Sequence, residues 1–423
     1  MNFVLLTALG LLLVATLTRY SAHRLSTVEY PFMLCLVIAG WVLPQLTGLY
    51  ITGAVPPDAL GKALFYVILC LLFGIGGYNA TRKTYKMANW QYSQTKLQFA
   101  AAALMLAGAF FYFRVSELAA EATQSYGGFW TGTITIYVFL SSMLTVGFVL
   151  AIGANIQKAT FLNRAMITFG LFIYLQRILI YGRREEAVEL FLIAGLYIWR
   201  KYGWVPNQLL VFGTFAVGTL FIFSVGNYRS IMIAQESYSW SGASLTQILD
   251  INFWDLFKSG FTDPLKNQEL KNAALSISAA DIRFEFNGGL SIWNQFVLAF
   301  IPGQIVGHDV KQNMLFSLPN LAYEEFHHIP WPGTTNTGFA DSFLSFWFFG
   351  AFVFFAIGSI MRNWFISAER GSLTALMIMM LISIKSLMAI THNSYDFFLF
   401  FVNVVIFLFP ALLFARKSRT RNV

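Results

Sequence analysis

Repeated apolar runs, each about as long as a membrane is thick, limit most strongly what this chain can fold into. Such runs with few charges recur along the sequence, for example at 63–80, 131–152 and 397–415. A helix crosses the hydrocarbon core of a bilayer with about 20 apolar residues. Charged residues make up only 11% of the chain, against about 25% in soluble globular proteins. The sequence therefore predicts an all-α polytopic membrane protein and argues against a soluble enzyme, a secreted disulfide scaffold or a nucleic-acid binder.

The apolar runs predict about eleven membrane-spanning helices. No positive charge precedes the first run, and Arg19 and Arg24 follow it, which favours an N-terminus on the outside. Alternation from that start leaves most of the 28 Lys and Arg on the inside, as expected for membrane proteins, and places the C-terminus inside. The predicted spans are 2–18, 31–49, 63–80, 98–113, 131–152, 164–181, 187–199, 205–226, 343–361, 373–390 and 397–415.

A long outside segment between the eighth and ninth spans interrupts this alternation. Residues 227–342 hold most of the acidic residues and contain apolar stretches that are too short to cross a bilayer. Leu290–Gly303 is a candidate re-entrant or interfacial segment, and Ile248–Phe257 has the pattern of an amphipathic surface helix. We expect this segment to form a cap on the membrane face. It divides the chain into eight spans at 1–226, the cap, and three spans with a basic tail at 343–423.

Several chemistries find no support in the sequence. Cys35 and Cys70 both lie in apolar segments without metal-ligand spacing, so we expect them to be inert packing residues. The net charge of +8 needs no nucleic-acid partner, because inner loops of membrane proteins collect Lys and Arg. The chain has no phosphate-binding loop, dinucleotide fingerprint, Asp-x-Asp carboxylate pair or metal cage. We therefore expect no cofactor, metal or nucleotide.

Arginines on the outside oppose the usual charge bias and are the first candidates for a binding site. Arg177 lies near the end of a span, and Arg183 and Arg184 follow shortly after it. Arg229 stands where a span opens into the cap, and Arg283 lies within the cap beside a Gly pair. Because a guanidinium presents a planar fork that matches phosphate oxygens, these residues together predict a seat for a lipid-linked diphosphate.

Neutralisation by neighbouring acids is the alternative for these arginines. Glu185 and Glu186 follow Arg184 directly, so the four charges could form an ordinary solvated turn. Asp281 and Glu285 flank Arg283 and could pair with it in the same way.

Two further residues could take part in chemistry on the outside. His392 lies on the short turn between the last two spans, with Lys385 about two helical turns earlier, and could act as a general base. The alternative is a loop histidine that caps a helix. Asp341 ends a stretch of small polar residues and aromatics that could contact a sugar, although Asp341 or Ser342 could instead cap the next helix. His327 and His328 are expected on the polar surface of the cap.

The arrangement resembles the Wzy-type O-antigen and oligosaccharide repeat-unit polymerases of bacterial inner membranes. The similar features are the span that ends in Gly182-Arg183-Arg184, the Arg-bearing outer loop, and the lead-in Pro332–Phe343 that continues into Phe349-Gly350. The resemblance covers nearly the whole chain in topology. It implies a GT-C-like glycosyltransferase, facing the periplasm, that moves a glycan from undecaprenyl diphosphate onto a new lipid-linked repeat unit.

The resemblance also implies roles for the candidate residues. Arg183 or Arg184 would hold the donor diphosphate together with Arg229 and Arg283, with Arg177 and Lys385 in support. His392 would activate or orient the acceptor hydroxyl, and Asp341 is a further catalytic candidate. The expected partners are the undecaprenyl-diphosphate-linked oligosaccharide and membrane lipid, and such enzymes can work with a chain-length regulator protein. The alternatives are an O-antigen ligase, which transfers the glycan to lipid A-core, and a lipid-linked glycan transporter or flippase.

Overall fold

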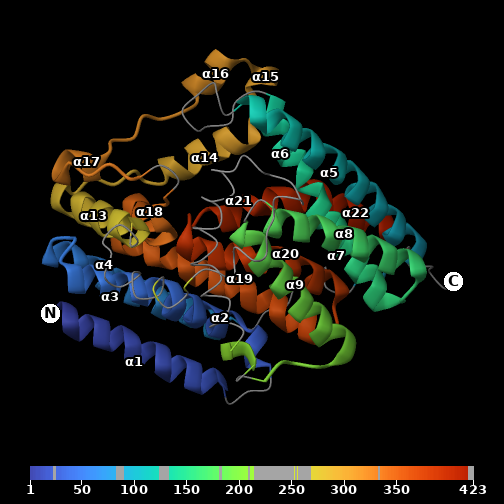
Figure 1. Cartoon of the computed structure of the whole chain (residues 1–423), viewed down its shortest axis with the longest axis horizontal. Helices are drawn as coiled ribbons and strands as arrows, with labels where there is room; N and C mark the ends of the chain where they lie inside the picture. The colour runs from blue at the N-terminus through green and yellow to red at the C-terminus, as the bar shows by residue number, and fades with distance from the viewer. Residues whose placement is uncertain are drawn as a thin grey trace.

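Helices make up nearly all of the regular structure of this chain. The structure is a computed structural model that describes residues 1–21, 25–81, 90–122, 133–180, 183–207, 210–213, 252, 255, 268–331 and 334–417. Within these ranges the chain is a bundle of helices (Figure 1), and the extended pairing found there is an isolated bridge between Tyr92 and Arg416. The predicted all-α fold is confirmed.

Eight segments of the described chain are long and apolar enough to cross a membrane. Each matches a predicted span, which confirms the polytopic character that the apolar runs predict. The eight segments are Asn2–Ser21, Tyr30–Thr52, Pro57–Ala80, Gln94–Val115, Ile134–Gln157, Thr337–Glu369, Leu373–Thr391 and Asp396–Ala415.

The other three predicted spans differ from these eight. The predictions at 164–181 and 187–199 correspond to helices α8 (Phe161–Leu179) and α9 (Arg184–Tyr202), which carry charged residues and are not among the eight. Most of the predicted span 205–226 lies outside the described residues. The count of eleven and the orientation in the membrane stay predictions.

The spanning segments contain the following helices. The N-terminal half comprises α1 (Asn2–Ser21), α2 (Tyr30–Val37), α3 (Leu43–Thr52), α4 (Pro57–Ala80), α5 (Gln94–Ala122), α6 (Thr133–Ser141) and α7 (Met143–Gln157). The C-terminal part comprises α18 (Thr337–Phe346), α19 (Ala351–Glu369), α20 (Leu373–Thr391), α21 (Asp396–Asn403) and α22 (Phe409–Ala415). Short π-helical turns, Ile38–Val42 and Val404–Leu408, join α2 to α3 and α21 to α22.

Helix α20 forms the centre of the bundle. Of its apolar stretch, 89% is buried inside the protein, against 28% in α1 and 28% in Asp396–Ala415. It packs against α19, α9, α21 and α7, so its side chains contact protein on all sides. Polar residues on α20 are therefore inside the molecule, whereas α1 and the α21–α22 segment leave much of their surface for lipid.

Glycines allow helices α4 and α19 to pack closely. A Cβ on Gly77 would lie 2.0 Å from the carbonyl oxygen of Phe355, and one on Gly358 would lie 2.2 Å from that of Gly74. Small residues let two membrane helices approach backbone to backbone, where van der Waals packing holds them together. The pair fixes the position of Lys62 near the start of α4.

Short helices gather at one end of the bundle, which we call the cap end (Figure 1). They are α13 (Gln268–Arg283), α14 (Leu290–Phe300), α15 (Gly303–Val306), α16 (His308–Asn313) and α17 (Leu321–Phe326). Helix α13 packs on α4, α17 and α18 and has a largely buried middle. Helix α14 buries Val297 and otherwise lies at the surface of the described protein. The predicted surface helix Ile248–Phe257 lies almost entirely outside the described residues.

The segment that follows the cap is broken rather than straight. Helix α18 begins at Thr337, within the predicted cap, and ends at Phe346; the next residue, Trp347, has a φ of 53° and a ψ of −143°. A 3₁₀ turn (Trp347–Gly350) then leads into α19. The predicted cap boundary at 342 therefore falls inside a helix, and the predicted span 343–361 contains a change of direction.

Candidate functional site

Charged residues meet where α8 ends, α9 begins and α20 approaches the cap end. Helix α8 carries Arg177 in its last turn, and α9 carries Glu185 and Glu186 in its first turn. Carboxylates are favourable at a helix N-terminus because the helix dipole is positive there. Glu189 follows Glu185 by four residues, so both lie on one face of α9. With Lys385 of α20, these residues form what we call the charge cluster.

Each cation of the charge cluster lies against a carboxylate. Glu186 Oε1 accepts from Arg177 Nη2 at 2.8 Å and from Arg183 Nη1 at 3.3 Å. Lys385 Nζ donates to Glu185 Oε1 at 2.6 Å. The side chain of Glu186 is only 6% exposed. The sequence alternative in which acids neutralise the arginines is therefore correct for Arg183, but the pairs are buried in part rather than fully solvated.

Arg177 retains a donor that none of these pairs uses. Its guanidinium lies over the rings of Tyr112 and Tyr174, with 5.4 Å and 6.0 Å from Cζ to the ring centroids. Its buried Nε has no hydrogen-bond partner among the residues that the structure describes. A buried N–H group without a partner is costly. An acceptor that reached Nε would remove this cost.

Glu189 lies one turn further along α9 than Glu185. It is buried, and the hydroxyl of Tyr174 donates to its Oε2 at 3.0 Å. Glu189 is not among the site residues predicted from the sequence, because that prediction started from cations that could bind a phosphate. The available signal was an acid inside the predicted span 187–199, since ionisable residues within membrane segments generally face a partner or a cavity.

Asp341 is buried in α18 and holds the turn that carries His392. Its Oδ2 accepts from the backbone N of Ser394 at 3.2 Å and from Ser394 Oγ at 2.5 Å. The sequence alternative that Asp341 or Ser342 caps the helix is wrong, because α18 begins earlier and has Asn336 at its N-cap position. Ser342 instead lies 3.0 Å from the hydroxyl of Tyr66. Asp341 therefore positions the turn.

His392 ends α20 on the same side as the charge cluster. Its Nδ1 lies 2.8 Å from Thr391 Oγ1, and His392 occupies the C-cap position of the helix. Burial lowers the pKa of His392, the charge of Glu185 acts to raise it, and the charge of Lys385 lowers it further. His392 is therefore neutral at neutral pH and can accept a proton. This geometry is compatible with both alternatives for His392, a general base and a loop histidine that caps a helix.

A chain of hydrogen bonds connects this turn to the cap. Thr335 Oγ1 donates to the carbonyl of Thr391 at 2.7 Å, and Asn272 Nδ2 donates to the carbonyl of Thr335 at 3.2 Å. Asn272 Oδ1 in turn lies 2.7 Å from His328 Nε2. His328 is thus half-buried against α13, which differs from the fully polar surface position expected for it. These hydrogen bonds join α13 to the turn that carries His392.

The remaining predicted arginines have different surroundings. Arg283 donates to Glu324 at 2.5 Å and to Glu325 at 3.4 Å, both on α17, rather than to its sequence neighbours. Arg184 lies near the start of α13, where burial raises the pKa of Glu269 and the charge of Arg184 opposes that rise. Arg229 lies outside the described residues. The structure therefore gathers Arg177, Arg183, Lys385, Asp341 and His392, and places Arg283 in the cap.

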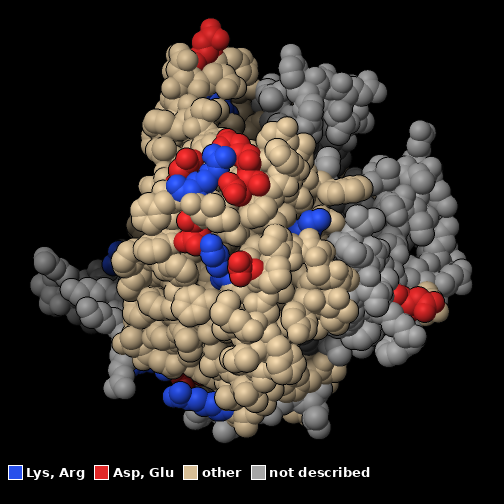
Figure 2. Space-filling view, turned by 90° about the vertical axis from the view of Figure 1, so that its left-hand side faces the viewer, with Lys and Arg blue, Asp and Glu red and all other residues tan. Residues whose placement is uncertain are grey.

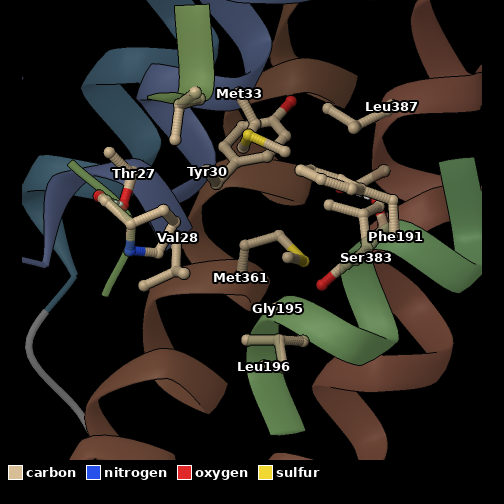
Figure 3. Close-up of a pocket in the computed structure, with 14 residues that line it drawn as sticks. Thr27, Val28, Tyr30, Met33, Phe191, Gly195, Leu196, Met361, Ser383 and Leu387 are labelled. Carbon is tan, nitrogen blue, oxygen red and sulfur yellow. Dashed lines mark hydrogen bonds between the residues drawn. The ribbon is translucent and has the colours of Figure 1, made fainter. Parts of the chain in front are cut away.

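A cavity of about 60 Å³ lies between α2, α9, α19 and α20. Phe191, Met361 and Ser383 are among its mostly apolar lining residues (Figure 3). Pockets that hold small molecules usually measure about 300–1,000 Å³. The cavity is too small for a glycan or a lipid chain, so we regard it as a packing space and not as the site.

Comparison with known proteins found no match among family models, curated proteins or solved structures. Within the described ranges, no group of three His, Cys, Asp or Glu side chains is placed to hold a metal ion. Fold and site together define a helical, multi-pass membrane protein with a partly buried charge cluster beneath a cap. The metal- and cofactor-independent mechanism stays a prediction.

Proposed function

We propose that this protein polymerises undecaprenyl-diphosphate-linked oligosaccharide repeat units at the periplasmic face of the bacterial inner membrane. The observation that best supports this is the convergence of Arg177, Lys385 and a neutral His392 beneath the cap. A diphosphate leaving group needs cations that offset its developing charge, and an acceptor hydroxyl needs a base. The cap end would face the periplasm, as the distribution of Lys and Arg favours.

The proposed reaction is a glycosyl transfer between two lipid-linked sugars. The acceptor hydroxyl attacks the anomeric carbon of the donor glycan, and a new C–O bond forms there. The bond from that carbon to the undecaprenyl diphosphate breaks, and its electron pair leaves with the diphosphate. His392 takes the proton of the hydroxyl. Arg177 binds the diphosphate through its Nε, while Glu186 fixes the orientation of the guanidinium.

Asp341 and the ion pair of Lys385 support these groups. Asp341 fixes Ser394 and so positions the turn that carries His392. Lys385 is held by Glu185, whose charge also acts on His392. Much of the rate enhancement would come from holding the donor and acceptor in line, which by itself lowers a barrier substantially.

A lipid-linked glycan transporter is the second candidate. Glu189 is buried in the bundle and bound by Tyr174, and acids at such positions commonly line transport or proton paths. An O-antigen ligase would use the same donor and differ in its acceptor, lipid A-core.

A complementation experiment separates these candidates. Cells that lack this protein receive the wild type, Arg177→Ala, the double variant Arg177→Ala/Glu186→Gln, or Arg164→Ala as a control. Arg164 lies at the opposite end of α8. We expect the wild type and the control to restore a polysaccharide ladder, and both Arg177 variants to leave single repeat units on the lipid. The double variant removes both buried charges, so its loss of activity cannot be attributed to an unpaired Glu186.

Other outcomes would contradict the proposal. An Arg177→Ala/Glu186→Gln variant that restores the full ladder at normal protein levels would exclude Arg177 from the reaction. Cells without the protein that still build long chains on the lipid carrier, but fail to attach them to lipid A-core, would identify a ligase. Repeat units that accumulate on the cytoplasmic side would identify a transporter.

A further inference from the structure

We propose that Phe284 and Trp347 form a sugar-binding subsite at the cap end, which stacks against one ring of the glycan chain. The inference rests on the proposed function for its substrate class. The subsite lies at the end of α13 and at the break after α18. Its role, sugar binding, is separate from that of the charge cluster. It also gives Arg283 a role in sugar binding instead of the diphosphate binding that the sequence predicts.

The two aromatic rings are presented by strained backbone. Phe284 has a φ of 55° and Trp347 a φ of 53°, which bulky side chains rarely adopt. Their ring centroids lie 5.7 Å apart in an edge-to-face arrangement, and Phe286 lies 5.4 Å from Phe284. Phe284 is 68% exposed. Such strain persists where the surroundings determine the conformation, and it is concentrated at binding sites.

Contacts from three elements fix this arrangement. Trp347 Nε1 donates to Asp281 Oδ1 at 3.1 Å, and Asp281 Oδ2 pairs with Lys62 of α4 at 2.5 Å. The backbone N of Asn287 donates to the carbonyl of Leu344 at 2.8 Å, which joins the segment after Phe284 to α18. The exposed ring of Phe284 is thus held in place before any ligand binds, which reduces the entropy that binding costs.

Charged groups border the rings on the same face. One ion pair joins Lys62 and Asp281, and the other joins Arg283 to Glu324 and Glu325. Figure 2 shows acidic and basic side chains gathered on the side of the molecule that lies on the left of Figure 1. All five side chains are partly exposed, so their carboxylate and guanidinium groups can exchange water for another polar partner.

This combination fits a sugar better than a lipid chain. A pyranose ring has an apolar C–H face that stacks on an aromatic ring, and hydroxyls at its edge that bond to carboxylates and guanidinium groups. A lipid tail over Phe284 would remove water from the two neighbouring ion pairs, and that desolvation is costly. The exposed ring therefore favours an amphipathic ligand, and under the proposed function this is a sugar of the growing chain.

Binding of the cell's own glycan tests the subsite. The probe is a set of oligosaccharides of two or three repeat units, released by mild acid from the host's surface polysaccharide. Saturation-transfer NMR measures their binding to the full-length protein in nanodiscs. We compare the wild type, Phe284→Ala, Trp347→Phe and Phe3→Ala. Phe3 is 65% exposed on α1 and is therefore a matched control.

We expect Phe284→Ala to weaken binding about tenfold, as the loss of one aromatic contact implies, and Phe3→Ala to change nothing. Trp347→Phe, which lacks the indole N–H that bonds to Asp281, should weaken binding less than Phe284→Ala. The subsite is rejected if the wild type does not bind the probe, if Phe284→Ala binds as tightly as the wild type, or if Phe3→Ala loses as much.

The same preparations distinguish this inference from the proposed function. A protein that builds polymer while Phe284→Ala leaves binding unchanged rejects the subsite alone. Binding that depends on Phe284, in a protein that builds no polymer from a verified lipid-linked substrate, rejects the polymerase and retains a glycan subsite.

Discussion

Glu186 is the residue on which two arginines converge. Because it is nearly buried, its removal would leave Arg177 without its ion-pair partner in a poorly hydrated place. We expect Glu186→Gln to lower the free energy of unfolding by about 3–5 kcal/mol. Arg183→Ala should cost no more than about 1 kcal/mol, because that side chain is 49% exposed. Thermal unfolding in detergent measures both, and equal losses would contradict the arrangement.

His392 makes stability depend on pH. Because its folded-state pKa lies below the ordinary value of 6.5, the unfolded chain takes up a proton first as the pH falls. Stability that is present above about pH 6.5 is then lost progressively at lower pH. We expect the melting temperature of the wild type to fall more between about pH 7 and pH 5 than that of His392→Gln. Parallel curves for both proteins would show that His392 does not titrate in this way.

The candidate site could be predicted from the sequence only in part. Arg177, Lys385, Asp341 and His392 stand out singly, because charged residues near the ends of apolar spans are conspicuous. Their partners are less visible, since Asp341 meets Ser394 across 53 positions and Lys385 meets Glu185 across 200. Such pairs depend on the packing of α18, α9 and α20, which no local pattern encodes. Arg283 likewise pairs with Glu324 and Glu325, 41 and 42 positions away, and not with the neighbouring Asp281 and Glu285 that the alternative named.

At the scale of the elements, the packing of α4 against α19 depends on glycines on both helices. Gly77 faces the backbone of α19, whereas a Cβ on Gly76 would have nothing within 4 Å. Gly77→Ala should therefore force the helices apart and cost at least about 1–3 kcal/mol, while Gly76→Ala should be nearly neutral. Unfolding temperatures of the two purified variants check this. An equal loss of unfolding temperature for Gly76→Ala would mean that the substitution acts on α4 itself and not on its contact with α19.

Helices were more predictable than their interruptions. Apolar runs of membrane length predict all eight segments that can cross a bilayer, because length and composition suffice for that inference. The break at Trp347 has no such signal, since the residue that its side chain contacts, Asp281 of α13, lies 66 positions away in the sequence. The start of α18 at Thr337 was hidden by the polar residues before it.

For the whole molecule, the Lys and Arg distribution predicts that the cap faces outward and the C-terminus inward. Single cysteines at Asp309→Cys, in the cap, and Ala159→Cys, between α7 and α8, test this because both positions are exposed. Cys35 and Cys70 are buried and should stay unreactive. A membrane-impermeant maleimide, applied to cells with a permeabilised outer membrane, should label Asp309→Cys and reach Ala159→Cys only after lysis. The reverse pattern would invert the topology.

The polymerase proposal is tested most directly by an in vitro reaction. Purified protein in detergent is mixed with its cognate undecaprenyl-diphosphate-linked repeat unit, without nucleotide or metal, and the products are separated on a glycan gel. We predict a ladder of lengthening chains for the wild type and for Arg164→Ala, and none for Arg177→Ala/Glu186→Gln or His392→Gln. Folded wild-type protein that leaves a verified substrate unchanged would contradict the account, and a product that forms only when lipid A-core is added would mean a ligase.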